Sequence, residues 1–394
     1  ATFVLGDGGV IVAGYPWLDV WSRDWLLAFR GTFLVREQIE RAQRSLQLLV
    51  AQLTDDFLPQ RLTVPNALRT PCIDASLWLF HAVEGVLDCK EDAEFLGQML
   101  PVLDRIFSRI ESGEKNHAWL TSEGLLENAG TVPLTWMDAH VDGHGFTPRR
   151  GLAVELQALW YAATQSYARL LERAGRVERA AEARELGERT RLAFGRRFWS
   201  TSTNYPFDCV SGESEKGDSW EDATIRPNGL IAAAVAPELF ESWQRLEILS
   251  RVEELLLTER GLRTLDPRSP VYASHAGGTI EERRAASHQG TVWPHLLLYY
   301  VRLKLHEDPT AHDLLRERVL ALLVRGRALG HVAQNADAEP PHRFRGSPAY
   351  AAATAMLLEA LVVDLGETVP TEPDSGPAEA GFSAHSTSTG EGRC

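Results

Sequence analysis

Apolar side chains recur along most of the chain at the three- and four-residue spacing of one helix face. Four such stripes are Val35, Ile39, Ala42, Leu46, Leu49 and Leu53; Phe95, Met99, Val102, Ile106 and Ile110; Leu239, Trp243, Leu246, Leu249, Val252 and Leu256; and Leu315, Val319, Leu322 and Leu323. Similar patterns predict helices near residues 74–88, 152–173, 177–197, 228–235, 291–306 and 347–364. Strand-like alternation is limited to residues 2–13 and 203–209, so the chain is predicted to be all-α.

Loops of a different character separate these helices. They combine Trp, Asp, Arg, His and amide side chains with Pro and Gly, in Gly14–Trp17, Leu134–Asp138, Ile225–Asn228 and His288–Pro294. Loops that carry such residues on a rigid scaffold usually carry function. Because they recur at roughly every second helix, we expect a closed helical ring whose loops meet at one face.

The composition changes after Leu365. Residues 366–394 are rich in Pro, Gly, Ser, Thr and Glu, which predicts a disordered tail. Residues 14–365 show no break and are predicted to form one helical domain. We interpret residues 1–13 as a short lead-in, the truncated end of a preceding domain, because the chain starts directly with an apolar, strand-like segment.

Charge and cysteine content narrow the classes of partner. A net charge of −14 argues against nucleic acid and anionic membrane surfaces, because both bind basic patches. No apolar run approaches the roughly 20 residues that span a bilayer. The four cysteines are dispersed and no signal peptide is visible, so a cytoplasmic location is expected. The 11 tryptophans suit flat apolar ligands such as sugar rings as well as cores.

Metal-binding motifs are not supported by the sequence. The segment that begins at Asp138 faintly resembles a calcium loop, but its twelfth position is Arg149, where a bidentate Glu is required. His140 and His144 would need a helix to share one face, and Gly143 between them disfavours a helix. We therefore interpret both as loop histidines rather than metal ligands.

One carboxylate is a candidate general acid. Hydrolysis of a sugar acetal needs a carboxyl that stays protonated near neutral pH, and a second carboxylate that activates water or attacks directly. Asp138 follows Trp136 and Met137, and apolar neighbours of this kind raise the pKa of a carboxyl. The alternative is that Asp138 caps the next helix or pairs with Arg149 or Arg150.

Two other acidic residues have both a functional and a structural interpretation. Asp24 follows Arg23, so an oriented carboxylate could accept two sugar hydroxyls; the alternative is an ordinary surface ion pair. Glu155 begins a strongly apolar helix, so its charge must be met either by a ligand or by a buried partner.

Six segments, in order, resemble the C-terminal amylo-α-1,6-glucosidase domain of glycogen debranching enzymes, glycoside hydrolase family 133. They are Ala13–Trp17 with Trp21–Asp24, Asp74–Trp78, Leu134–Ala139, Thr147–Arg149 with Val154–Glu155, Ile225–Asn228, and His288–Pro294. Together they cover nearly all of residues 10–365. The resemblance implies an (α/α)6 toroid of six inner and six outer helices, with no metal or organic cofactor.

The same resemblance implies an activity and a set of roles. The family removes α-1,6-linked glucose from branch stubs of glycogen or related α-glucans, with inversion. By resemblance, Asp138 is the general acid, and Arg23 and Asp24 hold the terminal glucose. The implied pocket residues are Trp136, Glu155, Arg226, Asn228, His288, Gln289 and Trp293.

One position departs from the family pattern. Family members carry their general base, a Glu, about eight residues before a Pro-His-Arg stretch, and the matching position before Pro341–Arg343 is Gln334. A carboxamide cannot take a proton from water, so activity is expected to be impaired. Alternatively, Asp337 or Glu339 supplies the carboxylate from a shifted loop, or the alignment of this loop is displaced by a few residues.

Two other functions fit the same scaffold. One is a non-catalytic glucan-binding domain. The other is a related toroid glycosidase of the glucoamylase, trehalase or mannosylglycerate-hydrolase type, although Thr135–Asp138 favours the debranching version. The sequence does not fix the oligomeric state.

Overall fold

The computed structural model describes residues 2–65, 69–115, 117–130, 134–213, 219–325, 327–328 and 330–368. In this part of the chain, twelve α-helices alternate with short strands. The predicted tail therefore lies outside the described residues from residue 369 onward.

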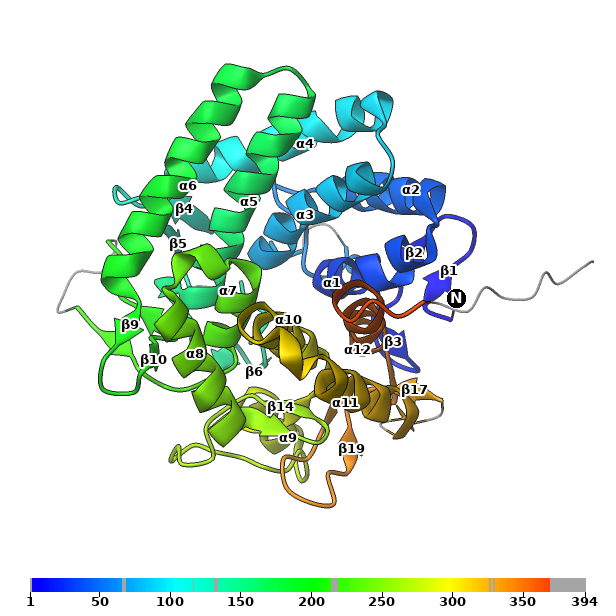
Figure 1. Ribbon diagram of the computed structural model, residues 1–394, viewed down its shortest axis with the longest axis vertical. Coiled ribbons are helices and arrows are strands. Elements are labelled where there is room, and N and C mark those ends of the chain that lie inside the picture. Colours follow the sequence, from blue (N-terminus) through cyan, green and yellow to red (C-terminus); the bar gives the residue numbers. More distant parts are fainter. Residues whose placement is uncertain are drawn as a thin grey trace, which may run out of the picture.

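Six helices contact one another in a closed ring (Figure 1). They are α1 (Ser22–Thr32), α3 (Ile73–Cys89), α5 (Val154–Arg173), α7 (Asn228–Val235), α10 (Leu297–Glu307) and α12 (Ala351–Glu359). Each packs against the next of these along the chain, and α12 packs back against α1. A Cβ atom at Gly31 would lie 1.9 Å from the Ala355 carbonyl oxygen, so the close approach of α1 and α12 requires glycine there.

Five further helices lie outside this ring: α2 (Ile39–Val50), α4 (Ala93–Glu111), α6 (Val177–Arg197), α8 (Ser242–Arg251) and α11 (His312–Arg325). Helix α6 is typical of them, because it buries Ala180, Ala183, Leu186 and Thr190 on one face and exposes Glu and Arg elsewhere. Helix α7 of the ring is instead buried from Asn228 to Ala234. Ring helices are therefore covered on several sides and outer helices on one.

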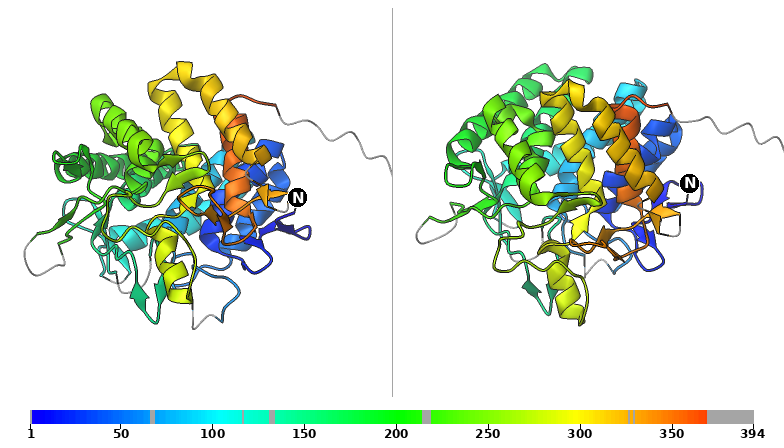
Figure 2. Two further views of the ribbon diagram at one scale, coloured as in Figure 1. Left: turned by 90° about the horizontal axis from the view of Figure 1, so that it is seen from below. Right: turned by 60° about the horizontal axis from the view of Figure 1, so that its bottom comes forward.

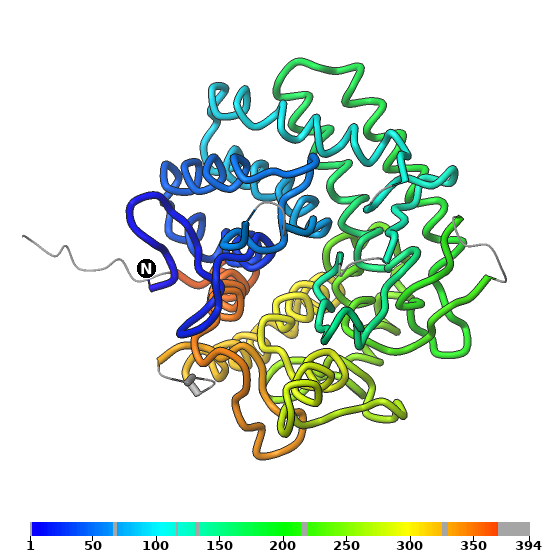
Figure 3. The backbone as a smooth tube through the Cα atoms, turned by 180° about the vertical axis from the view of Figure 1, so that it is seen from behind, coloured from blue at the N-terminus to red at the C-terminus, as the bar shows by residue number. Residues whose placement is uncertain are grey.

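The strands are two or three residues long and, with α9 (Ile280–His288), lie mainly on one side of the helix ring (Figures 2 and 3). The largest sheet orders β13 (Leu257–Thr258), β14 (Gly261–Arg263), β15 (Val292–Trp293), β18 (Asn335–Ala336) and β19 (Phe344–Arg345). A second sheet orders β12 (Glu221–Asp222), β11 (Cys209–Val210) and β8 (Leu152–Ala153).

The remaining strands form antiparallel pairs. These are β1 (Val4–Leu5) with β2 (Val10–Ile11), β3 (Gly14–Tyr15) with β20 (Ala349–Tyr350), β4 (Ala118–Leu120) with β5 (Leu126–Asn128), β6 (His140–Val141) with β7 (His144–Gly145), β9 (Trp199–Ser200) with β10 (Tyr205–Pro206), and β16 (Arg327–Ala328) with β17 (His331–Val332). The pair β3–β20 joins the segment before α1 to the segment before α12, with Gly14 opposite Tyr350. The chain is mostly helical, as predicted, and β1, β2 and β10 lie in the two segments predicted to be strand-like. The other short strands were not predicted, because strands of this length show no periodicity in a sequence.

Most predicted helices are confirmed, and two predictions need correction. The helix predicted over residues 291–306 begins only at Leu297, because Pro294 starts a 3-10 turn after β15. In the stripe predicted over residues 239–256, Trp243 and Leu246 are 54% and 52% exposed, while Ile248, Leu249 and Val252 are buried. Trp243 instead packs edge-on against Trp199. The helices α1 and α9 were not predicted.

Apolar side chains pack in two buried clusters, one in each half of the ring, and Trp78 and Val235 contact both. The β1–β2 hairpin contributes Phe3 and Ile11 to the first cluster. Within the described residues, no helix is long and apolar enough to cross a membrane.

Candidate functional site

The starts of all six ring helices carry polar or aromatic residues that contact one another. Arg23 and Asp24 lie in the first turn of α1, Asp74 begins α3, Glu155 begins α5, Asn228 begins α7, Trp293 precedes the turn into α10, and Tyr350 precedes α12. None of these six helices has a side-chain hydrogen bond from its N-cap residue. The positive ends of these helices favour carboxylates in this region.

Arg23 is the centre of a first network, the Arg23 cluster, formed with Gln60, Asp74 and Asp138. Its Nε donates to Asp74 Oδ2 at 2.6 Å and its Nη1 donates to Asp138 Oδ2 at 2.8 Å. Gln60 Nε2 donates to the same Asp138 oxygen at 2.7 Å. The alternative in which Asp138 pairs with Arg149 or Arg150 is therefore wrong, since its arginine is Arg23 from helix α1.

The pKa of Asp138 is shifted in the opposite direction from the one that its apolar sequence neighbours predict. Burial would raise its pKa, but the charge of Arg23, the hydrogen bond from Arg23 and the nearby His288 imidazole lower it to about 2. The apolar neighbours in the sequence were a poor guide, because Arg23 reaches Asp138 across 115 positions of the chain. The side chain of Asp138 is 22% exposed and lines a cavity of about 370 Å³, the Asp138 cavity, together with Gln60, Thr135 and Pro148.

Asp24 is held by a different partner from the one expected. Arg23 pairs with Asp74 and Asp138, and Asp24 accepts a hydrogen bond from the Tyr350 hydroxyl. Burial raises the pKa of Asp24 to about 6, although the Tyr350 hydrogen bond and the charge of Arg23 oppose the shift. Neighbouring Asp24 and Asp138 are therefore shifted in opposite directions.

A second network, the Asp208 cluster, consists of Arg149, Glu155, Asp208, Arg226 and Asn228. Arg149 pairs with both Glu155 and Asp208, and Asn228 Nδ2 donates to Asp208 Oδ1 at 2.7 Å. Arg226 Nε lies 3.8 Å from Asp208 Oδ2. All five residues are buried, so the charge of Glu155 is met by a buried partner. Glu155 Oε1 nevertheless has no hydrogen-bond partner among the residues that the structure describes.

Burial also raises the pKa of Glu155 to about 7, against the opposing charge of Arg149. Asp208, the acceptor that joins the whole cluster, was missed by sequence reasoning. It lies in none of the recognisable loop segments, and only the folded structure brings it to Arg149, Arg226 and Asn228.

An aromatic group connects the two networks. Trp136 Nε1 donates to Asn228 Oδ1 at 2.7 Å, and its ring meets Trp293 edge-on with centroids 5.9 Å apart. His288 stacks on Trp293 at 5.6 Å with its Nε2 3.9 Å from Asp138 Oδ1. Trp293 also contacts Tyr350, the partner of Asp24. The predicted residues Trp136, Asp24 and Trp293 therefore belong to one connected group.

Two predicted pocket residues hold a loop in place. Arg226 Nη1 donates to the His288 carbonyl at 2.6 Å, and its Nη2 donates to Gln289 Oε1 at 2.9 Å. Gln289 Nε2 in turn donates to the Phe146 carbonyl at 2.5 Å. The side chains of Arg226 and Gln289 thus fix the loop that presents His288 and Trp293.

The loop that carries Gln334 is joined to the region of Tyr350 by hydrogen bonds that involve backbone groups. Gln334 Oε1 accepts a hydrogen bond from the Ser347 N–H at 3.0 Å, and Ser347 Oγ donates to the Tyr15 carbonyl at 2.6 Å. Gln334 therefore lies beside the segment that leads into β20 and Tyr350. An amide oxygen that accepts a backbone N–H carries no charge and gives no basic group.

The two carboxylates that follow Gln334 have other partners. Asp337 is 2% exposed, pairs with Arg345 at 2.7 Å and accepts from the Ala276 N–H at 3.0 Å. Glu339 accepts from the Tyr272 hydroxyl at 3.1 Å. Among the described residues, neither carboxylate contacts the Arg23 cluster or the Asp208 cluster. Nor does any described group of three or more His, Cys, Asp or Glu residues have the geometry to hold a metal ion.

Comparison with known proteins gives a family and a related enzyme. Residues 6–359 match the family described as amylo-alpha-1,6-glucosidase. The chain is 24% identical to the glycogen debranching enzyme of Saccharomyces cerevisiae, in an alignment that covers 75% of this chain and 25% of the yeast protein. The chain thus spans about a quarter of the length of that relative.

Solved structures give the same general fold. A GH63 mannosylglycerate hydrolase from Thermus thermophilus, in complex with glucose, superimposes with a TM-score of 0.65 at 14% identity, covering 91% of this chain and 96% of that one. A structure of the same hydrolase with Tris gives a TM-score of 0.67 at 14% identity, with the same coverage of both chains. At this identity the likeness concerns the fold.

Proposed function

This chain belongs to the amylo-alpha-1,6-glucosidase family, and from that premise we propose that it is a glycoside hydrolase domain of the debranching type with impaired turnover. The proposed substrate is α-1,6-linked glucose at a branch stub of glycogen or a limit dextrin, hydrolysed with inversion. The observation that carries the proposal is the group formed by Asp138, Arg23, Trp136 and Trp293 at the starts of the ring helices.

We propose the (α/α)6 toroid as the detailed fold. The closed ring of contacts among α1, α3, α5, α7, α10 and α12 supports it, as do the helices α2, α4, α6, α8 and α11 outside that ring. Five outer helices lie in the described residues, one fewer than the six that the family resemblance implies.

In the proposed mechanism, the sugar contacts the aromatic group and Asp138 protonates the leaving oxygen. An apolar sugar face suits the indole ring of Trp136, which is partly exposed, while the buried Trp293 supports Trp136 edge-on. Asp24 accepts sugar hydroxyls, and Tyr350 holds its carboxyl in place. In the free protein, Arg23 keeps Asp138 ionised, so the acid role requires Asp138 to take up a proton when substrate covers its exposed side.

The base is the missing element of this mechanism. Gln334 occupies the position of the family base and is neutral, and Asp337 and Glu339 are engaged by Arg345 and Tyr272. Losing a general base typically lowers a rate by ~10²–10⁴-fold. These contacts support a slow enzyme that lacks a general base, rather than an enzyme in which Asp337 or Glu339 replaces it.

The substitution Gln334→Glu tests the proposal. Glu is nearly isosteric with Gln and can accept the same Ser347 N–H, so it restores a base without new contacts. We expect glucose release from a limit dextrin to rise by ~10²–10⁴-fold over wild type, and to be lost again in Gln334→Glu with Asp138→Asn. Ample wild-type activity that the substitution leaves unchanged would contradict the missing base.

Because Gln334 supplies no general base, it also favours a second candidate function, that of a non-catalytic glucan-binding domain. Affinity electrophoresis in gels containing glycogen separates the two functions. Retardation of the wild type, weakened by Trp136→Ala, together with no glucose release even from Gln334→Glu, favours binding alone. Release by Gln334→Glu supports the hydrolase.

A further inference from the structure

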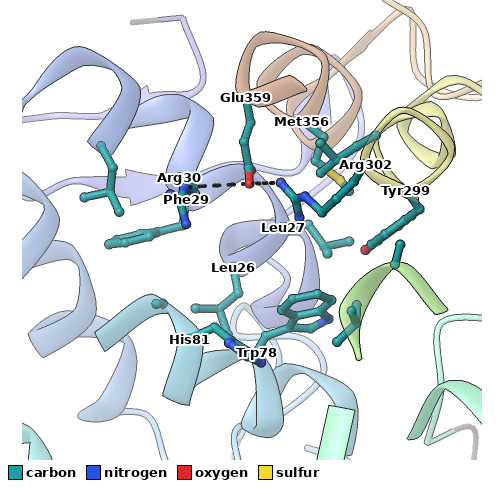
Figure 4. Close-up of a pocket in the computed structure, with 15 residues that line it drawn as sticks. Leu26, Leu27, Phe29, Arg30, Trp78, His81, Tyr299, Arg302, Met356 and Glu359 are labelled. Carbon is teal, nitrogen blue, oxygen red and sulfur yellow. Dashed lines mark hydrogen bonds and ion pairs between the residues drawn. The ribbon is translucent and has the colours of Figure 1, made fainter. Parts of the chain in front are cut away.

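A second cavity, the back cavity, lies among the ring helices and reaches the last turns of α1, α7 and α12 (Figure 4). Its volume is about 230 Å³, and its lining comes from α1, α3, α7, α10 and α12 and from the turn after α1. Leu26 and Leu27 lie one helical turn beyond Arg23, and Trp78 lies one turn beyond Asp74. Helices α1 and α3 therefore carry residues of both the Arg23 cluster and the back cavity.

Most of the back cavity wall is apolar or aromatic. Its apolar members include Leu26, Leu27, Phe29, Leu34, Ala82, Leu298 and Met356. Trp78 and Tyr299 extend toward the open space from α3 and α10 (Figure 4). A wall of this composition binds the apolar face of a small ring-shaped ligand, and an indole adds a flat surface for stacking.

Several polar atoms at this wall have no partner in the described part of the protein. His81 Nε2 is buried and makes no hydrogen bond, while His81 Nδ1 lies 3.2 Å from Ser166 Oγ. Burial lowers the pKa of His81 to about 4, so the imidazole is neutral near pH 7. The Tyr299 hydroxyl and the Trp78 indole N–H also have no hydrogen bond to a described residue, but unlike His81 Nε2 they are not fully buried. A buried polar atom such as His81 Nε2 normally finds a partner, and a bound ligand supplies one.

The charged side chains of the back cavity balance one another. Arg302 pairs with Glu359 at 2.9 Å and with Asp364 at 2.9 Å, and Arg30 Nε lies 3.8 Å from Glu359 (Figure 4). Each guanidinium already faces a carboxylate. Neither a phosphate nor an ammonium ligand would find an uncompensated opposite charge there, so the cavity selects for an uncharged ligand.

We propose that the back cavity binds a small uncharged ring compound with several hydroxyl groups, of the size of a monosaccharide. One face of the ring lies on Trp78, and hydroxyl groups bond with His81 Nε2 and the Tyr299 hydroxyl. This site is separate from the Asp138 cavity and does not depend on hydrolysis, because its lining includes no residue of the Arg23 or Asp208 cluster.

Fluorine NMR of the chain labelled with 5-fluorotryptophan tests the proposal with D-glucose as the probe. Trp78 reports on the back cavity and Trp136 on the Asp138 side, and Trp78→Phe and Trp136→Phe assign their resonances. We expect glucose to shift the Trp78 resonance saturably in the wild type and equally in Asp24→Asn, which weakens binding at the other end. Glucose 6-phosphate, the charged control, should leave the Trp78 resonance unmoved.

Two variants of the back cavity make the result decisive. Tyr299→Phe removes only a hydroxyl without a described protein partner, so it should fold normally and raise the Kd at the Trp78 resonance about fivefold. Ala82→Leu fills the space and should abolish the shift. The proposal is overturned if the Trp78 resonance shows no saturable shift, or if the shift persists in Ala82→Leu and disappears in Asp24→Asn. A loss of hydrolytic activity alone does not contradict the proposal that the back cavity binds a ligand.

Discussion

The two ends of the helix ring differ in how deeply they bury their arginines. At the starts of the ring helices, Arg23 and Arg149 each bind two carboxylates, and their side chains are 8% and 3% exposed. Toward the other end, Arg302 also binds two carboxylates, Glu359 and Asp364, but its side chain is 31% exposed beside an apolar cavity. The helix ring therefore holds a fully buried charge network at one end and a partly solvated one at the other.

This difference indicates which kind of ligand group each end of the ring can bind. The Asp208 cluster is fully buried and internally paired, yet Glu155 Oε1 has no partner within the described ranges. In the back cavity, the atoms without a described partner belong to neutral groups, those of His81, Trp78 and Tyr299. A charged or strongly polar ligand group therefore suits the first end, and an uncharged hydroxylated ligand suits the second.

The largest expected effect comes from removing one arginine at each end. Arg149→Met leaves Glu155 and Asp208 buried without their cation, which should lower the free energy of unfolding by about 3–5 kcal/mol. Arg302→Met is the matched control and should cost less, because the Arg302 side chain is 31% exposed and that of Arg149 only 3%. Urea unfolding measures both. Equal losses would contradict the contrast between the two ends.

A smaller effect separates the neighbouring carboxylates Asp138 and Asp24. The pKa of Asp138 is lowered to about 2, so its charge stabilises the fold above about pH 4 and this contribution is lost as the pH falls toward 2. The pKa of Asp24 is raised to about 6, so its ionisation costs stability above that pH and costs nothing below about pH 4.

Asp138→Asn should therefore lower the free energy of unfolding by about 2 kcal/mol near pH 7, whereas Asp24→Asn should leave it unchanged or raise it. The benefit of Asp24→Asn should shrink between about pH 6 and pH 4. Urea titrations across that range measure both. If both variants lowered the free energy of unfolding by the same amount at every pH, the opposite pKa shifts of Asp138 and Asp24 would be contradicted.

The smallest effect compares two buried tyrosines. Tyr350→Phe removes the hydrogen bond to Asp24 and should cost about 1 kcal/mol. Tyr299→Phe removes a hydroxyl with no described partner and should change stability by less than about 0.5 kcal/mol. Thermal or urea unfolding distinguishes them. A cost for Tyr299→Phe as large as that for Tyr350→Phe would mean that the Tyr299 hydroxyl has a stabilising role inside the protein.

Sequence reasoning located the site loops better than it described their chemistry. The segments around Trp136, Asn228 and Trp293 were predicted to meet, and their contacts at 2.7 and 5.9 Å agree with that. The pKa of Asp138 was predicted in the wrong direction. Local apolar neighbours are visible in a sequence, but the arginine that decides the charge comes from another helix.

What the sequence determined by itself is the succession of helices, because amphipathic spacing is a local property, as in Val177–Arg197. The sequence also predicted that the polar loops meet at one face of the ring. Only the tertiary structure decided which carboxylate meets which arginine, how Asp208 joins Arg149 to Asn228, and that a cavity lies beside Trp78. These depend on distances between residues far apart in the chain, which periodicity does not encode.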